Sequence, residues 1–419
     1  MLQHTEDEMI IQQLTSIYSA SADDAMAFAG QRNKLLVVIN DDLYFRLHRL
    51  EMGQAALNAG MEVTVVAQSV DNGLWLEKHG FRFIPTPLDR MGRNPLKEWT
   101  SLVRLIRIYL KEKPSIVHHF HMKPILYGSL AARFARIPAV VNTFAGLGSV
   151  FSSDDWRRRL LRGALRGSLR LSLALPNSRA LFENNADRER LIRAKVVRAD
   201  RTTVVCGAGV NISKFTPMPE QSGTALIVLA SRMIWEKGVG DFVDAARLLR
   251  EQNIQGRFIL VGAPDPDNPS SISESQLRAW QDEGVIEWWG FRQDMLPILA
   301  SAHIFVLPTF YGEGLPRILL EACACARPVV ATSIPGCTDV IDDGSNGLLV
   351  PPKDPRSLAR AIRTLLEDPV TRISMGRNGR EKVVNEFSTN RVISQVFDVY
   401  KELLTSVSLV SKQVESYRP

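Results

Sequence analysis

Short runs of consecutive apolar residues alternate with amphipathic stretches along the first half of the chain. The first run, residues 34–39, is continuously apolar after its lysine, as in a strand buried on both faces of a sheet. We expect further strands at 62–67, 81–85, 115–119, 139–143 and 201–206. We expect helices at 45–59, 74–79, 95–113, 123–136, 155–172 and 179–192. This alternation predicts an α/β fold with a parallel sheet.

The same alternation restarts after a stretch with the composition of a linker, Thr-Pro-Met-Pro-Glu-Gln-Ser-Gly at 216–223. Expected strands lie at 225–230, 258–262, 285–288, 303–308, 328–332 and 347–350. Expected helices lie at 239–252, 273–283, 294–301, 316–325, 355–367, 370–385 and 389–405. The pattern predicts an N-terminal extension over 1–30, a Rossmann-like domain over 31–215, a second over 216–388, and a helix and tail over 389–419 that cross back to the first domain. Two such domains would place a ligand cleft between them.

Length and composition fit two ordinary globular domains, since the chain has 419 residues of which 45% are hydrophobic and 23% charged. Four cysteines are too few for a disulfide framework at this length, which favours a reducing compartment. The spacing of Cys323 and Cys325 does not favour a metal site. No apolar window reaches the length of a membrane span, and the first residues are acidic rather than basic. We therefore expect a cytoplasmic location.

Charge is distributed unevenly along the chain. Residues 1–30 hold no Lys or Arg, whereas residues 31–215 hold 30 basic and 15 acidic residues, and residues 216–419 hold 21 and 25. A basic block indicates a polyanionic partner such as nucleic acid, anionic lipid or a phosphorylated substrate. Nucleic acid is the least favoured of these, because no aromatic stacking platform or known nucleic-acid module accompanies the charge.

The segment after the expected strand 303–308 carries two carboxylates in a glycine-rich frame. Glu313 lies between Gly312 and Gly314, and Glu321 lies further along the helix that follows. Glycines let the backbone at 312–315, including Leu315, approach a ligand closely. Free N–H groups at the start of the helix favour an anion. The frame predicts that the two carboxylates contact different parts of one elongated ligand.

A second loop follows the expected strand 225–230 and also opens a helix. It places Arg232 and Lys237 close together, with Gly238 and Gly240 beside them. Two fixed cations in such a loop can hold a diphosphate and stabilise a departing nucleotide without a metal ion.

These elements resemble the donor-binding domain of the GT-B glycosyltransferases of family 4. The residues that carry the resemblance are Glu313 and Glu321 with seven residues between them, Ser231-Arg232 with Lys237-Gly238, Gly209-Val-Asn211, Gly336-Cys-Thr-Asp339 and Gly347-Leu-Leu-Val-Pro-Pro352. The resemblance implies that Glu313 contacts the donor sugar, Glu321 the ribose, and Arg232 and Lys237 the diphosphate. It also implies retention of anomeric configuration and a UDP-sugar donor. Asp339 and Asn211 depart from the residues usual in the family.

The first domain is similar to a subgroup that extends polyprenyl-diphosphate-linked sugars, with N-acetylgalactosaminyltransferases among its members. The similarity rests on His118-His-Phe-His121 with the residues that follow it and on Asn142-Thr-Phe-Ala-Gly-Leu-Gly148. His118, His119 and His121 lie at a strand end, where one could hydrogen-bond the transferring sugar or the acceptor. We expect His119 or His121 to act, and metal binding by the cluster is the lesser alternative.

One expected helix carries a row of arginines beside a row of leucines. Arg158, Arg162, Arg166 and Arg170 are spaced four apart, and Leu161, Leu165 and Leu169 form the neighbouring row. Such a helix can lie on an anionic membrane or contact a lipid diphosphate. The alternative is an ordinary domain helix that packs its leucines and exposes its arginines to water.

Together these features predict a retaining, metal-independent glycosyltransferase without a cofactor, peripheral on the cytoplasmic face of the membrane. It would move an N-acetylhexosamine or hexose from a UDP-sugar to a polyprenyl-diphosphate-linked saccharide. Alternatives are transfer to a soluble acceptor, a nucleotide-sugar 2-epimerase and, least favoured, a non-enzymatic basic binding protein. The donor sugar, linkage position and oligomeric state are not readable from the sequence.

Overall fold

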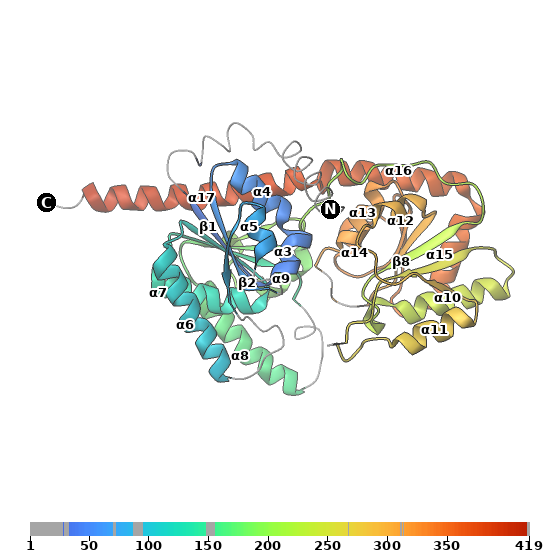
Figure 1. The fold of residues 1–419 in the computed structure, drawn as a ribbon, viewed down its shortest axis with the longest axis horizontal. Coiled ribbons are helices and arrows are strands. Elements are labelled where there is room, and N and C mark those ends of the chain that lie inside the picture. The colour runs from blue at the N-terminus through green and yellow to red at the C-terminus, as the bar shows by residue number, and fades with distance from the viewer. Residues whose placement is uncertain are drawn as a thin grey trace. The chain divides into compact units, whose positions relative to one another are not determined.

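A computed structural model describes residue 28 and residues 33–69, 73–86, 95–147, 156–266, 268–310, 312 and 314–416. The chain forms two compact units (Figure 1). Unit 1 comprises Met1–Ala208 and Asn390–Pro419, and unit 2 comprises Gly209–Thr389. The chain thus enters unit 2 several residues before the expected boundary at 216, because the backbone of Val210 hydrogen-bonds to Phe387 and Thr389.

Unit 1 is built on a seven-stranded parallel sheet with the order β3-β2-β1-β4-β5-β6-β7. Its strands are β1 (Lys34–Asp41), β2 (Glu62–Gln68), β3 (Arg82–Pro85), β4 (Ile116–Phe120), β5 (Ala139–Phe144), β6 (Ser178–Phe182) and β7 (Thr202–Val204). Its helices are α3 (Asp42–His48), α4 (Leu50–Asn58), α5 (Leu74–Lys78), α6 (Pro95–Glu112), η1 (Pro124–Gly128), α7 (Ser129–Ala135), α8 (Trp156–Leu173), α9 (Asn185–Arg193), η2 (Ala199–Arg201) and α17 (Thr389–Ser416).

Both faces of this sheet are covered, which explains the continuous apolar run of β1. Leu35 and Val37 belong to a core shared with α3, α4 and α17, whereas Leu36 and Val38 belong to a core shared with α6 and α7. Figure 1 shows α4 and α17 on one side of the strands and α6, α7 and α8 on the other. Helix α17 adds Phe397 among others to the first core, so this last helix is an integral part of unit 1.

One local expectation for unit 1 was wrong, and one helix differs from its expectation only in the type of its first turn. The helix expected over 179–192 is strand β6 followed by the shorter helix α9. Strand β6 pairs with β5 and β7 on its two sides, and tertiary pairing therefore outweighs the local helical pattern. The helix expected over 123–136 begins as a π-helical turn, η1, before it continues as α7.

Unit 2 repeats the architecture with a six-stranded parallel sheet, order β10-β9-β8-β11-β12-β13. Its strands are β8 (Leu226–Ala230), β9 (Arg257–Val261), β10 (Glu287–Trp288), β11 (Ile304–Leu307), β12 (Val329–Thr332) and β13 (Gly347–Val350). Its helices are η3 (Trp235–Lys237), α10 (Val239–Glu251), α11 (Glu274–Asp282), α12 (Leu296–Ser301), α13 (Arg317–Ala324), α14 (Cys337–Val340), α15 (Pro355–Glu367) and α16 (Pro369–Glu386). In Figure 1, α12, α13 and α16 lie on one side of this sheet, and α10, α11 and α15 on the other.

Arginines of unit 2 hold the segment that was expected to be a linker. Arg327 is buried and donates to the carbonyls of Met218 and Ala300. Arg372 forms an ion pair with Glu220 at 2.8 Å. Because these guanidinium groups satisfy backbone and carboxylate oxygens around residues 218–220, the segment is fixed to unit 2 and is not a free tether.

Two loops of unit 2 come into contact at Gly238, between η3 and α10. Its φ is 72°, in the left-handed region, and a Cβ atom placed there would lie 2.1 Å from the carbonyl oxygen of Pro308. Only glycine permits both the backbone conformation and this close approach. Gly238 therefore joins the loop after β8 to the loop after β11.

We predict that Gly238→Ala destabilises unit 2 by roughly 2–4 kcal/mol, since it combines a left-handed alanine with overpacking against backbone. Chemical denaturation of the purified chain would measure this loss.

Gly312→Ala is the matched control, because a Cβ atom at Gly312 meets nothing within 4 Å. Its free energy of unfolding should change by less than about 0.5 kcal/mol. Equal stability of the two variants would contradict the close contact at Gly238.

Candidate active site

The two glycine-containing loops of unit 2 meet where its strand order reverses, between β8 and β11. The backbone N–H of Phe310 donates to the carbonyl of Glu236 at 2.9 Å, and the Thr309 hydroxyl donates to the same oxygen at 3.0 Å. Open parallel sheets bind ligands at such a reversal, outside the carboxyl ends of the strands. The structure thus brings together the two segments that the sequence singled out.

The cations of the first loop occupy different surroundings. Arg232 is exposed and donates to Asp265 Oδ2 at 2.6 Å. Lys237 ends the short η3 turn and is half-buried. A diphosphate at this loop would share the Arg232 guanidinium with Asp265 or displace that carboxylate.

Glu321 lies on α13 with its side chain largely buried. Arg317, one turn earlier on the same helix, donates from Nε to Glu321 Oε1 at 2.9 Å. This contact fixes one carboxylate oxygen, so that the group is held in a defined orientation. Pro316 is the N-cap that precedes α13, so the helix begins one residue later than the expected range 316–325.

The loop between β11 and α13 is described only in part. Gly312 is exposed, whereas Gly314 and Leu315 are buried. Glu313, the residue expected to contact the donor sugar, lies outside the described residues, and its predicted role stays a prediction.

In unit 1, His118 and His119 are interior residues. His119 is fully buried. Its Nδ1 lies 2.8 Å from Asn142 Oδ1, and because an amide oxygen can only accept, Nδ1 carries the proton and donates. Nε2 therefore accepts from the Tyr109 hydroxyl at 2.8 Å. His118 lies within hydrogen-bonding distance of Tyr400 and Thr143, at 2.7 and 2.6 Å. Burial lowers the pKa of His119 to about 4 and that of His118 well below its ordinary value. Both rings are therefore neutral at pH 7.

This geometry corrects the expectation that His119 acts on the substrate. Both ring nitrogens are used inside the domain, and Gly128 of η1 packs so closely that a Cβ atom there would lie 2.3 Å from His119 Nε2. His119 is a structural residue that ties β4 to β5 and α6.

His121 differs from its two neighbours. It follows the end of β4 with a φ of 70°, and its carbonyl accepts from the backbone N–H of Ile125 at 3.0 Å. Its ring is only partly buried and packs edge-on against Tyr44 of α3, with ring centroids 4.3 Å apart. Because β1 and β4 flank the reversal of strand order in unit 1, Tyr44 and His121 mark the corresponding ligand-binding edge.

Beside this edge lies a buried ion pair that the sequence did not reveal. Arg49 Nη2 donates to Glu183 Oε1 at 2.7 Å, and Nη1 donates to the carbonyl of Gly207 at 3.1 Å. The guanidinium also stacks over Phe120, 4.6 Å from the ring centroid. Arg49 joins segments after β1, β6 and β7, and Glu183 was missed because its segment looked helical.

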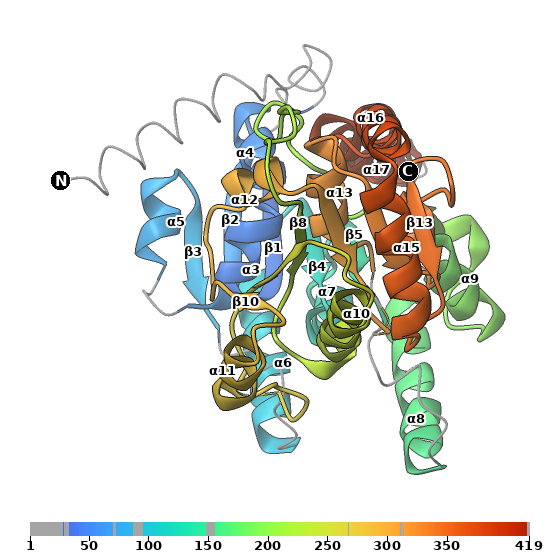
Figure 2. The same ribbon diagram turned by 90° about the vertical axis from the view of Figure 1, so that its right-hand side faces the viewer.

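The arginine row on α8 is described only toward the end of the helix. Arg166 and Arg170 are exposed, while Leu169 and Leu173 are buried against the unit 1 core. Arg158 and Arg162 lie within the helix, but their side chains are outside the described part. Figures 1 and 2 both show α8 projecting past the strands of unit 1. Packed leucines and exposed arginines coexist on this helix.

Within the described part of the chain, no group of three or more His, Cys, Asp or Glu side chains is arranged to hold a metal ion. None of the described helices combines the length and apolar character needed to cross a bilayer.

Family models match both halves of the chain. The model described as "Glycosyl transferases group 1" covers residues 224–368, and "Glycosyl transferase 4-like" covers residues 34–173. The first includes both loops of the unit 2 site, and the second includes His121 and all of α8.

Curated relatives match about four fifths of the chain. The Campylobacter jejuni N,N'-diacetylbacillosaminyl-diphospho-undecaprenol alpha-1,3-N-acetylgalactosaminyltransferase is 26% identical over 83% of this chain and 92% of its own length. The Escherichia coli UDP-Gal:alpha-D-GlcNAc-diphosphoundecaprenol alpha-1,3-galactosyltransferase is 26% identical over 77% of this chain and 84% of its own.

Solved structures share the fold. HepE from Anabaena in complex with UDP matches with a TM-score of 0.72 and 19% identity, over 88% of this chain and 100% of that one. Sucrose-phosphate synthase from Thermosynechococcus elongatus matches with a TM-score of 0.72 and 20% identity, over 90% and 100%. With two parallel Rossmann-like sheets and these matches in both halves, the chain belongs to the GT-B glycosyltransferases of group 1, with a family 4-like first half.

Proposed function

We propose that this enzyme transfers a sugar from a UDP-sugar to a saccharide carried on polyprenyl diphosphate, with retention and without a metal ion. The observation that carries the proposal is the similarity to two undecaprenol-diphosphate-directed transferases over most of both chains. Transfer would take place at the cytoplasmic face of the membrane, in surface polysaccharide or glycan assembly.

In the proposed reaction, unit 2 holds the donor. Glu321 accepts hydrogen bonds from the ribose hydroxyls, and Arg232 and Lys237 bind the diphosphate. Glu313 contacts the sugar. As the bond from the anomeric carbon to the diphosphate oxygen breaks, the two cations stabilise the negative charge that develops on the departing UDP. Fixed cations in this position supply the electrostatic role that a metal ion has in other transferases.

Unit 1 binds the acceptor. Its hydroxyl oxygen bonds to the anomeric carbon on the face that UDP leaves, and its proton passes to the departing diphosphate oxygen. We assign the hydrogen bond to the sugar or the acceptor to His121, and its partly exposed ring beside Tyr44 supports this assignment. The arginine row of α8, Arg158, Arg162, Arg166 and Arg170, would contact the lipid diphosphate or the anionic membrane surface.

A soluble acceptor is the second candidate. The Mycobacterium tuberculosis alpha-maltose-1-phosphate synthase is 25% identical over 77% of this chain and 87% of its own length. The basic first half favours the lipid-linked acceptor over this alternative, because a diphosphate anchor and an anionic membrane are both polyanions.

The first prediction of the proposed function concerns the substrates. With a panel of nucleotide-sugars and a polyprenyl-diphosphate-sugar extract, nucleoside diphosphate release should require one UDP-sugar together with the lipid fraction. Release with water-soluble acceptors alone would keep the enzyme class and discard the lipid acceptor. An altered free nucleotide-sugar would instead identify a 2-epimerase.

The second prediction concerns Glu321. Glu321→Gln should raise the KM for the donor roughly 10- to 100-fold, since a charged acceptor of ribose hydrogen bonds contributes about 1.5–3 kcal/mol. Donor KM and UDP affinity by calorimetry would both report the change.

Glu367→Gln is the matched control for Glu321→Gln. Glu367 accepts from Arg363 Nε at 2.8 Å, also one turn apart on a helix, but this pair is exposed on α15. An equal effect of the two substitutions on donor binding would remove Glu321 from the site.

The third prediction separates His121 from His119. His121→Asn should lower kcat at least tenfold with little effect on unfolding, because asparagine tolerates the left-handed backbone and the ring serves the reaction. His119→Asn should lower the free energy of unfolding by roughly 2–4 kcal/mol, since Tyr109 and Asn142 lose a buried partner. Denaturation and steady-state assays on both variants test this, and a stable, inactive His119→Asn variant would reverse the assignment.

A further inference from the structure

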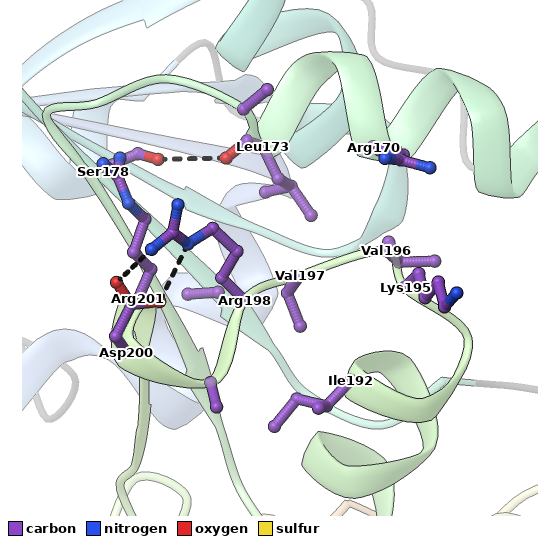
Figure 3. Close-up of a pocket in the computed structure, with 13 residues that line it drawn as sticks. Arg170, Leu173, Ser178, Ile192, Lys195, Val196, Val197, Arg198, Asp200 and Arg201 are labelled. Atoms are coloured by element: carbon purple, nitrogen blue, oxygen red, sulfur yellow. Dashed lines mark hydrogen bonds and ion pairs between the residues drawn. The ribbon is translucent and has the colours of Figure 1, made fainter.

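Unit 1 contains a hollow of about 660 Å³ (Figure 3), and of the residues that line it only Arg170 has a role in the proposed function above. Its apolar wall is made by side chains from the end of α8, from β6, from the end of α9 and from the segment after α9. Among them are Leu173, Ala180, Ile192, Val196 and Val197. An apolar wall of this kind favours hydrocarbon over a fully polar ligand.

Four cations and one carboxylate surround this apolar wall. Asp200 is engaged by Arg198, which donates from Nε and Nη2 at 3.0 and 2.9 Å, and Arg201 donates to the carbonyl of Leu175. Arg170 and Lys195 are exposed, and in the view of Figure 3 both lie at the end of the hollow away from Asp200. The rim therefore carries an excess of positive charge.

The surrounding segment has the same character. Residues 156–201 hold 13 basic and 4 acidic residues. Arg166 and Arg170 are exposed on one side of α8, and Arg170 also lines the hollow. Leu169 of the same helix packs into the core of unit 1. A surface with this charge attracts anionic lipid at about 1 kcal/mol for each basic residue near the membrane.

The hollow is separate from the acceptor edge. Its β6 lining begins at Ser178, where that strand starts, and residues 198–201 directly precede β7. Because all strands of the sheet are parallel, these residues lie at its amino edge. His121 and Tyr44 lie at the carboxyl edge, so a ligand in the hollow cannot be the reacting sugar.

We propose that this hollow binds an anionic phospholipid of the membrane. Lys195 and Arg170 would hold the phosphate, and the first methylene groups of an acyl chain would cover Ile192 and Val197, which are partly exposed. A phospholipid bound there would hold unit 1 at the membrane surface. This binding would need neither the sugar donor nor the saccharide acceptor.

The test compares two charge reversals two residues apart, Lys195→Glu at the rim and Arg193→Glu outside the lining. The full chain is sedimented with vesicles of phosphatidylcholine alone or mixed with phosphatidylglycerol. Lys195→Glu should lower the partition coefficient on the mixed vesicles roughly 20-fold. Arg193→Glu should lower it less than about threefold, since Arg193 is exposed and already pairs with Glu189.

A third variant tests the apolar wall. Ile192→Trp fills the hollow and should weaken binding to the mixed vesicles, whereas simple adsorption to the surface would be unchanged or strengthened by an added tryptophan. Inorganic phosphate at the same phosphate concentration should not release the protein, because it lacks the acyl chain. Equal losses for Lys195→Glu and Arg193→Glu, release by phosphate, or undiminished binding of Ile192→Trp would each overturn the proposal.

Transfer to a water-soluble acceptor analogue serves as the independent readout. Lys195→Glu should retain this activity and its circular dichroism spectrum while losing vesicle binding. If vesicle binding behaves as expected but no donor and acceptor pair reacts, the proposed transfer reaction fails while the lipid site stands.

Discussion

The reversal of strand order in each parallel sheet is the constraint on which the rest of the structure depends. Connections from β1 and β4, and from β8 and β11, leave their sheets toward opposite faces, so no helix covers the point between them. Loops must satisfy their own backbone groups there. In unit 2 they do so through the carbonyl of Glu236, and the contact at Gly238 leaves room for no side chain. The glycines of the sequence pattern are therefore consequences of topology as well as of ligand binding.

Most of the fold could be predicted because strands buried on both faces must be continuously apolar, a signal that β1 and β8 carry in full. Strand β6 could not, because its identity depends on its two neighbours in the sheet and Arg179 interrupts its apolar run. The two loops of the unit 2 site could be singled out because their residues are local in sequence, with carboxylates, cations and glycines within a few residues, and the structure brings the loops together. Their role in binding a donor stays a prediction. The structural role of His119 could not be predicted, because its hydrogen-bond partners Tyr109 and Asn142 belong to other elements that are distant in sequence.

The Arg49–Glu183 pair shows the same limit in a stronger form. Its members lie 134 positions apart and neither stands out in its own segment. Desolvating two charges is expensive, and the cost is offset only when the remaining donors are also satisfied. Here Gly207 accepts one of them and Phe120 offers its ring face, whereas the buried Nε of Arg49 has no hydrogen-bond partner among the described residues. The pair joins three strand ends and thereby fixes the edge on which Tyr44 and His121 lie, so a purely structural interaction shapes the candidate acceptor site.

Charge alone does not identify a binding surface in this protein, because several arginines are buried and bind other groups of the same chain. Arg327 and Arg372 are buried with backbone and carboxylate partners. Arg49, in the basic half of the chain, is likewise buried and donates to Glu183 and Gly207. What distinguishes residues 156–201 is that excess charge remains exposed there next to apolar side chains, on Arg166, Arg170 and around the hollow. Exposed cations beside accessible hydrocarbon favour a partner that is both anionic and apolar, and a membrane lipid meets both requirements where a nucleic acid meets only the first.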